Sequence, residues 1–397
     1  MLNNAKLTLW HRRALFIGII LISINLRAPI TSVGVVLSEI QDTFSVTEAQ
    51  IGLVGVIPLV TFGIFSLIVP KVTRRIDASI CLWFSLLFLS LGIVWRSCFG
   101  YVNYLLGTFL MSASIQFGNV IIPSLIKRYF PQQLGLLTGL YTVAMNLVGA
   151  LVTSLTGSLS LAYGWRWTLG GFVFITLITL LVWTIQLYLQ GKLVSEELNE
   201  EKSQERHRHL FKSKLAWMVT LFMGCQSLLF YTLIHWLPAF LSSKGADVAL
   251  SSYLSSLIQF ANIPTCFIIP ILAGRTASQR IYIMLAGNLA IISLLGLFYA
   301  PLNWMWLFTI LMGVAIGIMF SMALLFFPLK TKHTQDAIEL SGMAQALGYS
   351  FAGLGPLVFG VLRMLSGQFT LSFVFLILMM VILLIVGWIV GDKHAMI

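Results

Sequence analysis

The stretch TLSFVFLILMMVILLIVGWIV, residues 370–390, contains no charged side chain. As an α-helix it is long enough to cross a hydrocarbon core of about 30 Å, at about 1.5 Å per residue. Strands of a membrane β-barrel would instead alternate apolar and polar residues over about ten positions. The unbroken apolar run therefore predicts a transmembrane helix.

Similar apolar runs recur along the whole chain. Of its 397 residues, 58% are hydrophobic and 9% are charged, whereas soluble domains carry roughly 25% charged residues. The expected spans are 14–37, 49–69, 79–95, 101–126, 134–159, 166–190, 215–240, 250–273, 281–299, 303–327, 337–361 and 370–390. We expect an all-α membrane protein with twelve transmembrane helices in two pseudo-symmetric six-helix lobes.

One hydrophilic segment, 191–214, separates six expected spans from six. It predicts an N-terminal lobe at 1–190, a linker at 191–214 and a C-terminal lobe at 215–397. Each half also has a short basic loop between its second and third spans, at 71–77 and 274–280. Alternating-access transporters use such a layout, with the substrate site near the midplane between repeats.

The distribution of positive charge predicts the orientation. Nineteen of the 24 Lys and Arg residues fall in the termini, the linker and alternate loops; Arg27 falls inside a span, and the other four on the opposite side. Those four are Arg96, Arg166, Lys244 and Arg363. The positive-inside rule then puts both termini and the linker in the cytoplasm. The net charge of +11 thus reports topology, and we expect no nucleic-acid partner.

Arg27 is the sharpest functional signal, because a guanidinium inside the bilayer costs several kcal/mol or more. None of the thirteen acidic residues is expected at its depth. Ser23, Thr31 and Gly34 share its helix face, and Pro29 should loosen the helix beside it. We expect Arg27 to bind an anionic group of a substrate. The alternative is a structural arginine bonded to carbonyls or to polar side chains of another span.

Polar side chains at helical spacing also follow one face of several other spans. The faces include Gln116 with Asn119, Tyr231 with Gln226 adjacent to its face, Gln259, and Gln345 with Tyr349. For each of these residues, hydrogen bonding between helices is as open an interpretation as substrate contact. His235 lies beside Trp236, an expected interfacial anchor, and a substrate or proton role for it is the less favoured hypothesis.

Enzyme chemistry has no support in the sequence. No phosphate-binding G-x-x-x-x-G-K-[ST] loop is present, and the histidines and acids do not cluster within the spans. The four cysteines have no metal-like spacing. We therefore expect no cofactor, no bound metal and no catalytic residue. The expected partners are the lipid bilayer, a small-molecule substrate, and a proton or counter-substrate; uniport stays open, and a monomer is expected.

Four stretches are similar to the cyanate/nitroimidazole transporter branch of the major facilitator superfamily. They are NLRAPITSVG (25–34), NVIIPSLIK (119–127), QSLLFYTLIHWLPAFL (226–241) and LSGMAQALGYSFAGLGP (340–356). The resemblance implies alternating access and a small polar or anionic substrate in the bacterial inner membrane. The positions it points to as facing the cavity are Asn25, Arg27, Thr31, Asn119, Gln226, Tyr231, Trp236, Gln345 and Tyr349.

The chain also departs from that pattern. Ala28 intervenes between Arg27 and Pro29, and Val35 stands where proline is common in the branch. These departures shift the expected kink by one residue. A second transporter hypothesis, broad drug efflux with aromatic and methionine side chains as an adaptable wall, stays open at this point.

Overall fold

The computed structural model describes residues 9–190 and 210–397, so most of the expected linker at 191–214 lies outside the described residues. In the described ranges every regular element is helical, and twelve helical segments are long and apolar enough to cross a membrane. These segments are Trp10–Val36, Leu53–Thr73, Ala78–Cys98, Tyr101–Tyr129, Pro131–Tyr163, Trp165–Leu189, Lys214–Ser243, Tyr253–Arg275, Arg280–Tyr299, Leu302–Leu329, Thr334–Ser366 and Thr370–Val390. The expected all-α class and span count are confirmed.

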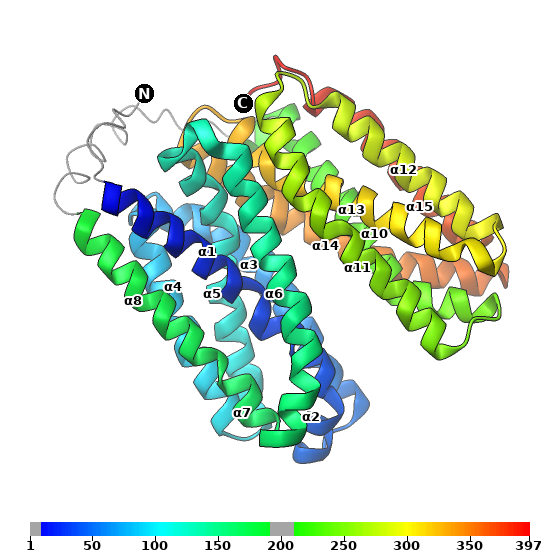
Figure 1. Cartoon of the computed structure of the whole chain (residues 1–397), viewed down its shortest axis with the longest axis horizontal. Coiled ribbons are helices and arrows are strands. Elements are labelled where there is room, and N and C mark those ends of the chain that lie inside the picture. Colours follow the sequence, from blue (N-terminus) through cyan, green and yellow to red (C-terminus); the bar gives the residue numbers. More distant parts are fainter. Residues whose placement is uncertain (1–8, 191–209) are drawn as a thin grey trace. The chain divides into compact units, whose positions relative to one another are not determined.

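The individual elements are labelled in Figure 1 where there is room. The first half contains α1 (Leu9–Thr31), η1 (Val33–Val36), α2 (Leu37–Phe44), α3 (Glu48–Thr73), α4 (Ala78–Cys98), α5 (Tyr101–Tyr129), η2 (Pro131–Gln133), α6 (Leu134–Tyr163), α7 (Trp165–Gly170) and α8 (Phe172–Gln190). The second half contains η3 (Leu210–Lys212), α10 (Lys214–Ser243), α11 (Val248–Arg275), α12 (Arg280–Tyr299), η4 (Leu302–Trp304), α13 (Met305–Leu329), α14 (Thr334–Ser366) and α15 (Thr370–Val390).

The chain divides into two compact units. Unit 1 comprises 1–125 and 144–209, and unit 2 comprises 126–143 and 210–397. The end of α5 and the first third of α6 therefore belong to unit 2. The lobe boundaries expected from the sequence, at 1–190 and 215–397, stay a prediction.

In unit 1, α8 packs against both α1 and α4. The fully buried Trp183 of α8 donates from Nε1 to the carbonyl of Ser79 at 2.8 Å. Gly18 of α1 lies so close to this indole that a Cβ there would be 2.7 Å from it. A small residue on α1 therefore lets a large aromatic residue fill the space between three helices.

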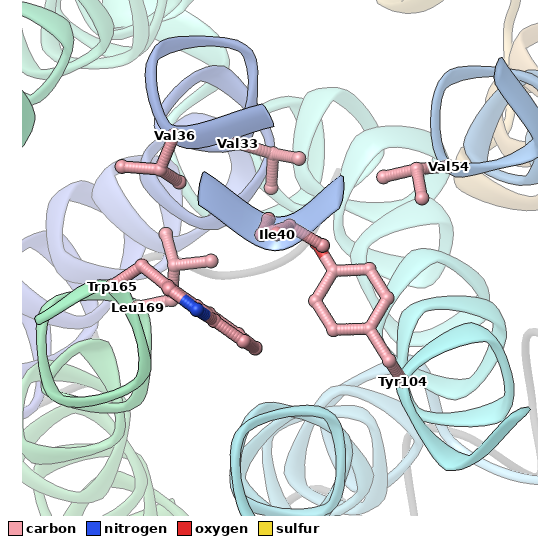
Figure 2. Packing of buried hydrophobic residues seen from close by; sticks show 7 residues of the cluster. All are labelled: Val33, Val36, Ile40, Val54, Tyr104, Trp165 and Leu169. Atoms are coloured by element: carbon pink, nitrogen blue, oxygen red, sulfur yellow. The ribbon is translucent and has the colours of Figure 1, made fainter. Parts of the chain in front are cut away.

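A second feature of unit 1 is the apolar cluster that surrounds η1 and α2. Figure 2 shows its seven buried members, from η1, α2, α3, α5 and α7: Val33, Val36, Ile40, Val54, Tyr104, Trp165 and Leu169. Tyr104 and Trp165 meet edge to face at 5.9 Å. The indole Nε1 of Trp165 donates to Thr43 Oγ1 at 2.9 Å. The cluster holds the segment that follows α1 against the rest of unit 1.

In unit 2, α10 packs on α14, and α11 packs on α13. A Cβ at Gly317 of α13 would lie 2.6 Å from the carbonyl oxygen of Asn262 on α11, so this crossing is a direct backbone contact. Thr142 of α6 donates to the carbonyl of Cys266 at 2.8 Å, and Lys127 of α5 donates to Thr331 Oγ1 at 2.9 Å. Apolar surface gains little by moving from lipid to a helix interface, so close packing at small residues and hydrogen bonds from hydroxyls hold these helices together.

Candidate substrate site

Arg27 lies in the last part of α1, within the span Trp10–Val36. Its side chain is half-buried, and in the described part of the chain it makes no hydrogen bond or salt bridge. Its Cγ approaches α6, where a Cβ added at Gly149 would lie 3.3 Å away. The close glycine leaves room for the side chain to pass along α6. The guanidinium therefore remains available to a ligand.

The helix that carries Arg27 ends just beyond it. α1 stops at Thr31, and the chain continues as a short 3-10 helix and then α2, so the first span is discontinuous. Thr31 Oγ1 donates to the carbonyl of Arg27 at 3.2 Å, and Ser32 Oγ donates to that of Ala28 at 2.9 Å. The carbonyl of Ala28 also accepts from the backbone N–H of Ser32 at 3.4 Å, so the two hydroxyls add side-chain hydrogen bonds at this end of the helix. The loosening expected near Pro29 is thus a break that begins at Ser32.

Arg96 supplies a further cap to the same helix end. Its Nη1 donates to the carbonyl of Pro29 at 2.9 Å, and its side chain is fully buried. The span expected at 79–95 ends too early, because α4 continues to Cys98 and Arg96 lies in its last turn. Gly107 of α5 permits this, because a Cβ there would lie 2.5 Å from the backbone nitrogen of Arg96. Extending the expected span from residue 95 to Cys98 would have placed Arg96 inside the helix and indicated its burial.

Asn25 is engaged in packing α1 against α8. Its Nδ2 donates to Thr179 Oγ1 at 2.8 Å, and its Oδ1 accepts from Thr176 Oγ1 at 2.7 Å. The side chain is buried, and it also donates to the carbonyl of Leu21. Both ends of the amide are thus used within unit 1 in packing α1 against α8, and the substrate contact expected for Asn25 stays a prediction.

Gln116 and Asn119 lie on α5, one turn apart. Gln116 is fully buried and donates from Nε2 to Ser66 Oγ on α3. Asn119 is half-buried and donates to Gln116 Oε1 at 3.2 Å. Gln116 therefore joins α5 to α3, and Asn119 is the more accessible of the two.

In unit 2 the two predicted glutamines are buried and bonded near their own positions. Gln226 on α10 donates to Ser227 Oγ at 2.6 Å, and Gln345 on α14 donates to Ser341 Oγ at 2.9 Å. Both side chains are at most 2% exposed. The half-buried tyrosines of the same two helices, Tyr231 and Tyr349, offer more accessible surface.

Trp236 and Gln259 have different surroundings in unit 2. Trp236 donates from Nε1 to the carbonyl of Pro356 at 2.9 Å and lies beneath the Arg363 guanidinium at 5.5 Å. It thus ties α10 to α14. Gln259 of α11 is exposed and lines a cavity of about 220 Å³ together with Ser255 and Phe230. His235 is exposed and meets the Trp236 ring edge to face.

Among the described residues, no group of three or more His, Cys, Asp or Glu side chains lies close enough together to bind a metal ion.

Outside the spans, Lys330 is buried and donates to Gln279 Oε1 at 3.1 Å and to the carbonyl of Asp392 at 2.8 Å. Burial lowers the pKa of Lys330 to about 8. Asp392 forms a salt bridge of 2.6 Å with Arg280. This cluster joins two loops of unit 2 to the segment after α15.

Comparison with known proteins gives relatives over almost the whole chain. An uncharacterized transporter of Bacillus subtilis (strain 168), YycB, is 35% identical over 93% of this chain and 91% of its own length. A 2-nitroimidazole transporter of Escherichia coli (strain K12) is 32% identical over 97% of each chain. The cyanate transport protein CynX of the same organism is 27% identical over 93% of this chain and 94% of its own length.

Solved structures agree with the fold. The proton:xylose symporter XylE matches with a TM-score of 0.76 at 13% identity, over 94% of each chain. The transporter FucP in its outward conformation matches with a TM-score of 0.72 at 13% identity, over 94% of this chain and 97% of its own.

The family model named Major Facilitator Superfamily matches residues 15–353. Members of this family are transporters, which confirms that the chain is not an enzyme and that its partners include a small-molecule substrate and the membrane. The multi-pass membrane location is likewise confirmed by the twelve spans. The chain belongs to the Major Facilitator Superfamily.

Proposed function

We propose that this transporter moves a small anion or a small polar solute, cyanate-like or nitroimidazole-like, by alternating access. Arg27 is the residue that binds the substrate. The observation that carries the proposal is the half-buried guanidinium of Arg27, inside a span, with no hydrogen bond or salt bridge in the described part of the chain.

The electrostatics of the membrane interior support this role. A guanidinium away from water is stabilised only by an opposite charge or by hydrogen-bond acceptors. A cyanate ion supplies the charge, and a nitro group supplies two oxygens that match the fork of the guanidinium. The names of two relatives, a 2-nitroimidazole transporter and a cyanate transport protein, support the same substrate class.

The break in α1 supports a site at this position as well. Discontinuous membrane helices are common at the substrate sites of secondary transporters, because their ends expose oriented polar groups. Here the caps on Arg27, Ala28 and Pro29 hold the helix end in place. Thr31, whose hydroxyl makes one of these three bonds, lies one turn from Arg27 on the same face.

The protein acts as a monomer in the bacterial inner membrane, with both termini in the cytoplasm. Its substrate flux is coupled to a proton or to a counter-substrate. Uptake measured with and without a pH gradient, and with and without substrate inside the vesicles, separates these two modes from uniport.

The test is uptake of radiolabelled cyanate and of 2-nitroimidazole into proteoliposomes. Wild-type protein is expected to transport at least one of them. Arg27→Gln should lower transport about 100-fold, equivalent to about 2.7 kcal/mol, while Arg27→Lys restores part of it because it keeps the charge but loses the fork. Arg275→Gln, which removes an exposed arginine at the C-terminal end of α11, is the matched control and should transport normally.

Near-normal transport by Arg27→Gln would contradict the role of the arginine. Competition by structurally unrelated apolar compounds, with no effect of cyanate or nitroimidazole, would instead support broad drug efflux.

A further inference from the structure

An apolar groove lies in unit 1 between α3, α4 and α5, the helices labelled in Figure 1. Its volume is about 380 Å³. Five of the lining side chains are phenylalanines: Phe65, Phe84, Phe88, Phe109 and Phe117. The two serines of the lining, Ser85 and Ser114, each donate to a carbonyl of their own helix at 2.8 Å. The walls therefore suit a hydrocarbon ligand.

The groove has the length of a lipid tail region. It follows α4 from Ile76, just before the helix begins, to Phe88. At about 1.5 Å per residue this distance is about 18 Å, slightly more than half of a hydrocarbon core of about 30 Å. Phe84 and Phe88 are each 45% exposed, so the groove is open along its side. A chain within one leaflet can enter it laterally.

One end of the groove is basic. Val72 and Ile76 line that end, and the exposed side chains of Lys71 and Arg75 are their neighbours in the sequence. The backbone N–H groups of Arg75 and Ile76 both donate to the carbonyl of Val72 at 3.0 Å, which fixes this turn. Basic residues at the membrane surface attract anionic lipid headgroups.

The nearby carboxylate of Asp77 does not remove this positive character. It accepts from the backbone N–H of Ser79 at 2.8 Å and thereby caps α4. The turn carries three cationic side chains, with Arg74 as the third, against this one acid. A long apolar groove with a cationic end matches an amphiphile that has one negatively charged headgroup.

We propose that this groove binds one acyl chain of an anionic phospholipid, with its phosphate at Lys71 and Arg75. The site is separate from Arg27 and does not depend on which solute is transported. Phospholipids without net charge fit the groove but lack the negative charge that the basic end of the groove attracts.

The experiment measures lipid binding to the purified full-length protein by native mass spectrometry in mild detergent. Phosphatidylglycerol and phosphatidylcholine with identical acyl chains are titrated separately. The wild type is expected to bind phosphatidylglycerol about tenfold more tightly. Arg75→Gln should weaken phosphatidylglycerol about fivefold and leave phosphatidylcholine unchanged. Ala113→Phe, which fills the groove, should weaken both lipids about tenfold.

Two controls match these variants. Arg275→Gln removes an exposed arginine at the C-terminal end of α11 in unit 2, and Val102→Phe adds a ring at an exposed position of α5 that does not line the groove. Neither should change the affinity for either lipid. If Ala113→Phe does not fold, Phe88→Ala removes an exposed wall and should weaken both lipids.

Equal affinity of the wild type for the two lipids would overturn the headgroup assignment. Unchanged binding in both groove variants would overturn the acyl-chain site. A dimer that forms in competition with lipid, and is lost in Ala113→Phe, would overturn the proposal in favour of a second copy of the chain.

Discussion

Arg27 and Arg96 are both arginines inside the spans of unit 1, yet their surroundings differ. Arg96 is fully buried and donates to the carbonyl of Pro29 at 2.9 Å. Arg27 is half-buried and has no hydrogen bond or salt bridge within the described residues. Taking a cation out of water costs free energy in both cases, and the cost is larger for the fully buried Arg96. One is used to hold the end of α1, and the other remains for a ligand.

The comparison shows how a membrane protein can use one residue type for two tasks. The negative end of a helix dipole favours a cation, and its last carbonyls need donors. Arg96 meets both needs of α1, although its Nε and Nη2 find no partner among the described residues. The helix end that Arg96 stabilises is the one that carries Arg27.

The largest expected effects come from replacing Arg27 in one variant and Arg96 in another. Arg27→Gln should lower transport about 100-fold with little change in thermal stability. Arg96→Met should lower transport less than tenfold, but the unpaired Pro29 carbonyl should cost about 1–3 kcal/mol of stability. Proteoliposome uptake and thermal unfolding in detergent measure the two quantities. If Arg96→Met folds normally and abolishes transport while Arg27→Gln does not, the assignment of roles is reversed.

A smaller effect is expected at Gly149. A Cβ there would lie 3.3 Å from Arg27 Cγ and 3.8 Å from Thr31 Cγ2. Gly149→Val adds further atoms at this contact and should displace the arginine side chain, raising the KM for substrate about tenfold. Gly157→Val, where a Cβ meets only Val35 at 3.6 Å, is the matched control on the same helix. Equal KM values for the two variants would argue that Arg27 does not bind the substrate.

Asn25 tests the distinction between packing and binding. Asn25→Val removes the bonds to Thr176 and Thr179, whose hydroxyls keep their bonds to Phe172 and Ile175 carbonyls. Polar contacts between membrane helices average about 0.6 kcal/mol, so two of them predict a stability loss of about 1 kcal/mol. The KM should stay unchanged. A raised KM at unchanged stability would place Asn25 among the residues that touch the substrate.

Lys330 is a buried cation outside the spans, and the pH dependence of stability tests the effect of its burial. Its folded pKa of about 8 is below the ordinary value of 10.5. The unfolded chain therefore binds the proton more tightly, and stability should rise as the pH increases from about 8 toward 10.5. Lys330→Met should remove the share of this rise that comes from Lys330, so its increase in stability between pH 8 and pH 9.5, measured by thermal unfolding, should be smaller than that of the wild type. Lys332→Met, at an exposed position, should keep the rise, and an equal rise in Lys330→Met would refute the assignment.

The number of spans could be predicted because membrane thickness sets their length. An apolar run such as 370–390 has one stable arrangement in lipid, and the structure has a spanning helix, α15, over the same residues. Arg27 could be singled out for the same reason, since a charge in such a run is rare and expensive. No comparable rule covered Arg96, because its position near a span end fits both an outer loop and the last turn of a helix.

The polar positions show the limit most clearly. Asn25 and Arg27 are two residues apart in one motif, and both were expected to face the cavity. In the structure, Asn25 bonds to α8 with both ends of its amide, whereas Arg27 passes α6 beside Gly149. The rotation of α1 against its neighbours decides this, and that rotation depends on how side chains from distant parts of the chain fit together.

The sequence by itself determined the helical class, the twelve spans, and one arginine inside them that no acid at its depth balances. Those properties follow from local composition, because lipid penalises every exposed charge and every unpaired backbone group. Only the tertiary structure decided where α1 ends, which carbonyl Arg96 caps, and which polar side chains are already bonded. Such partners lie far apart along the chain, as Arg96 and Pro29 do, so their pairing exists only once the helices have packed.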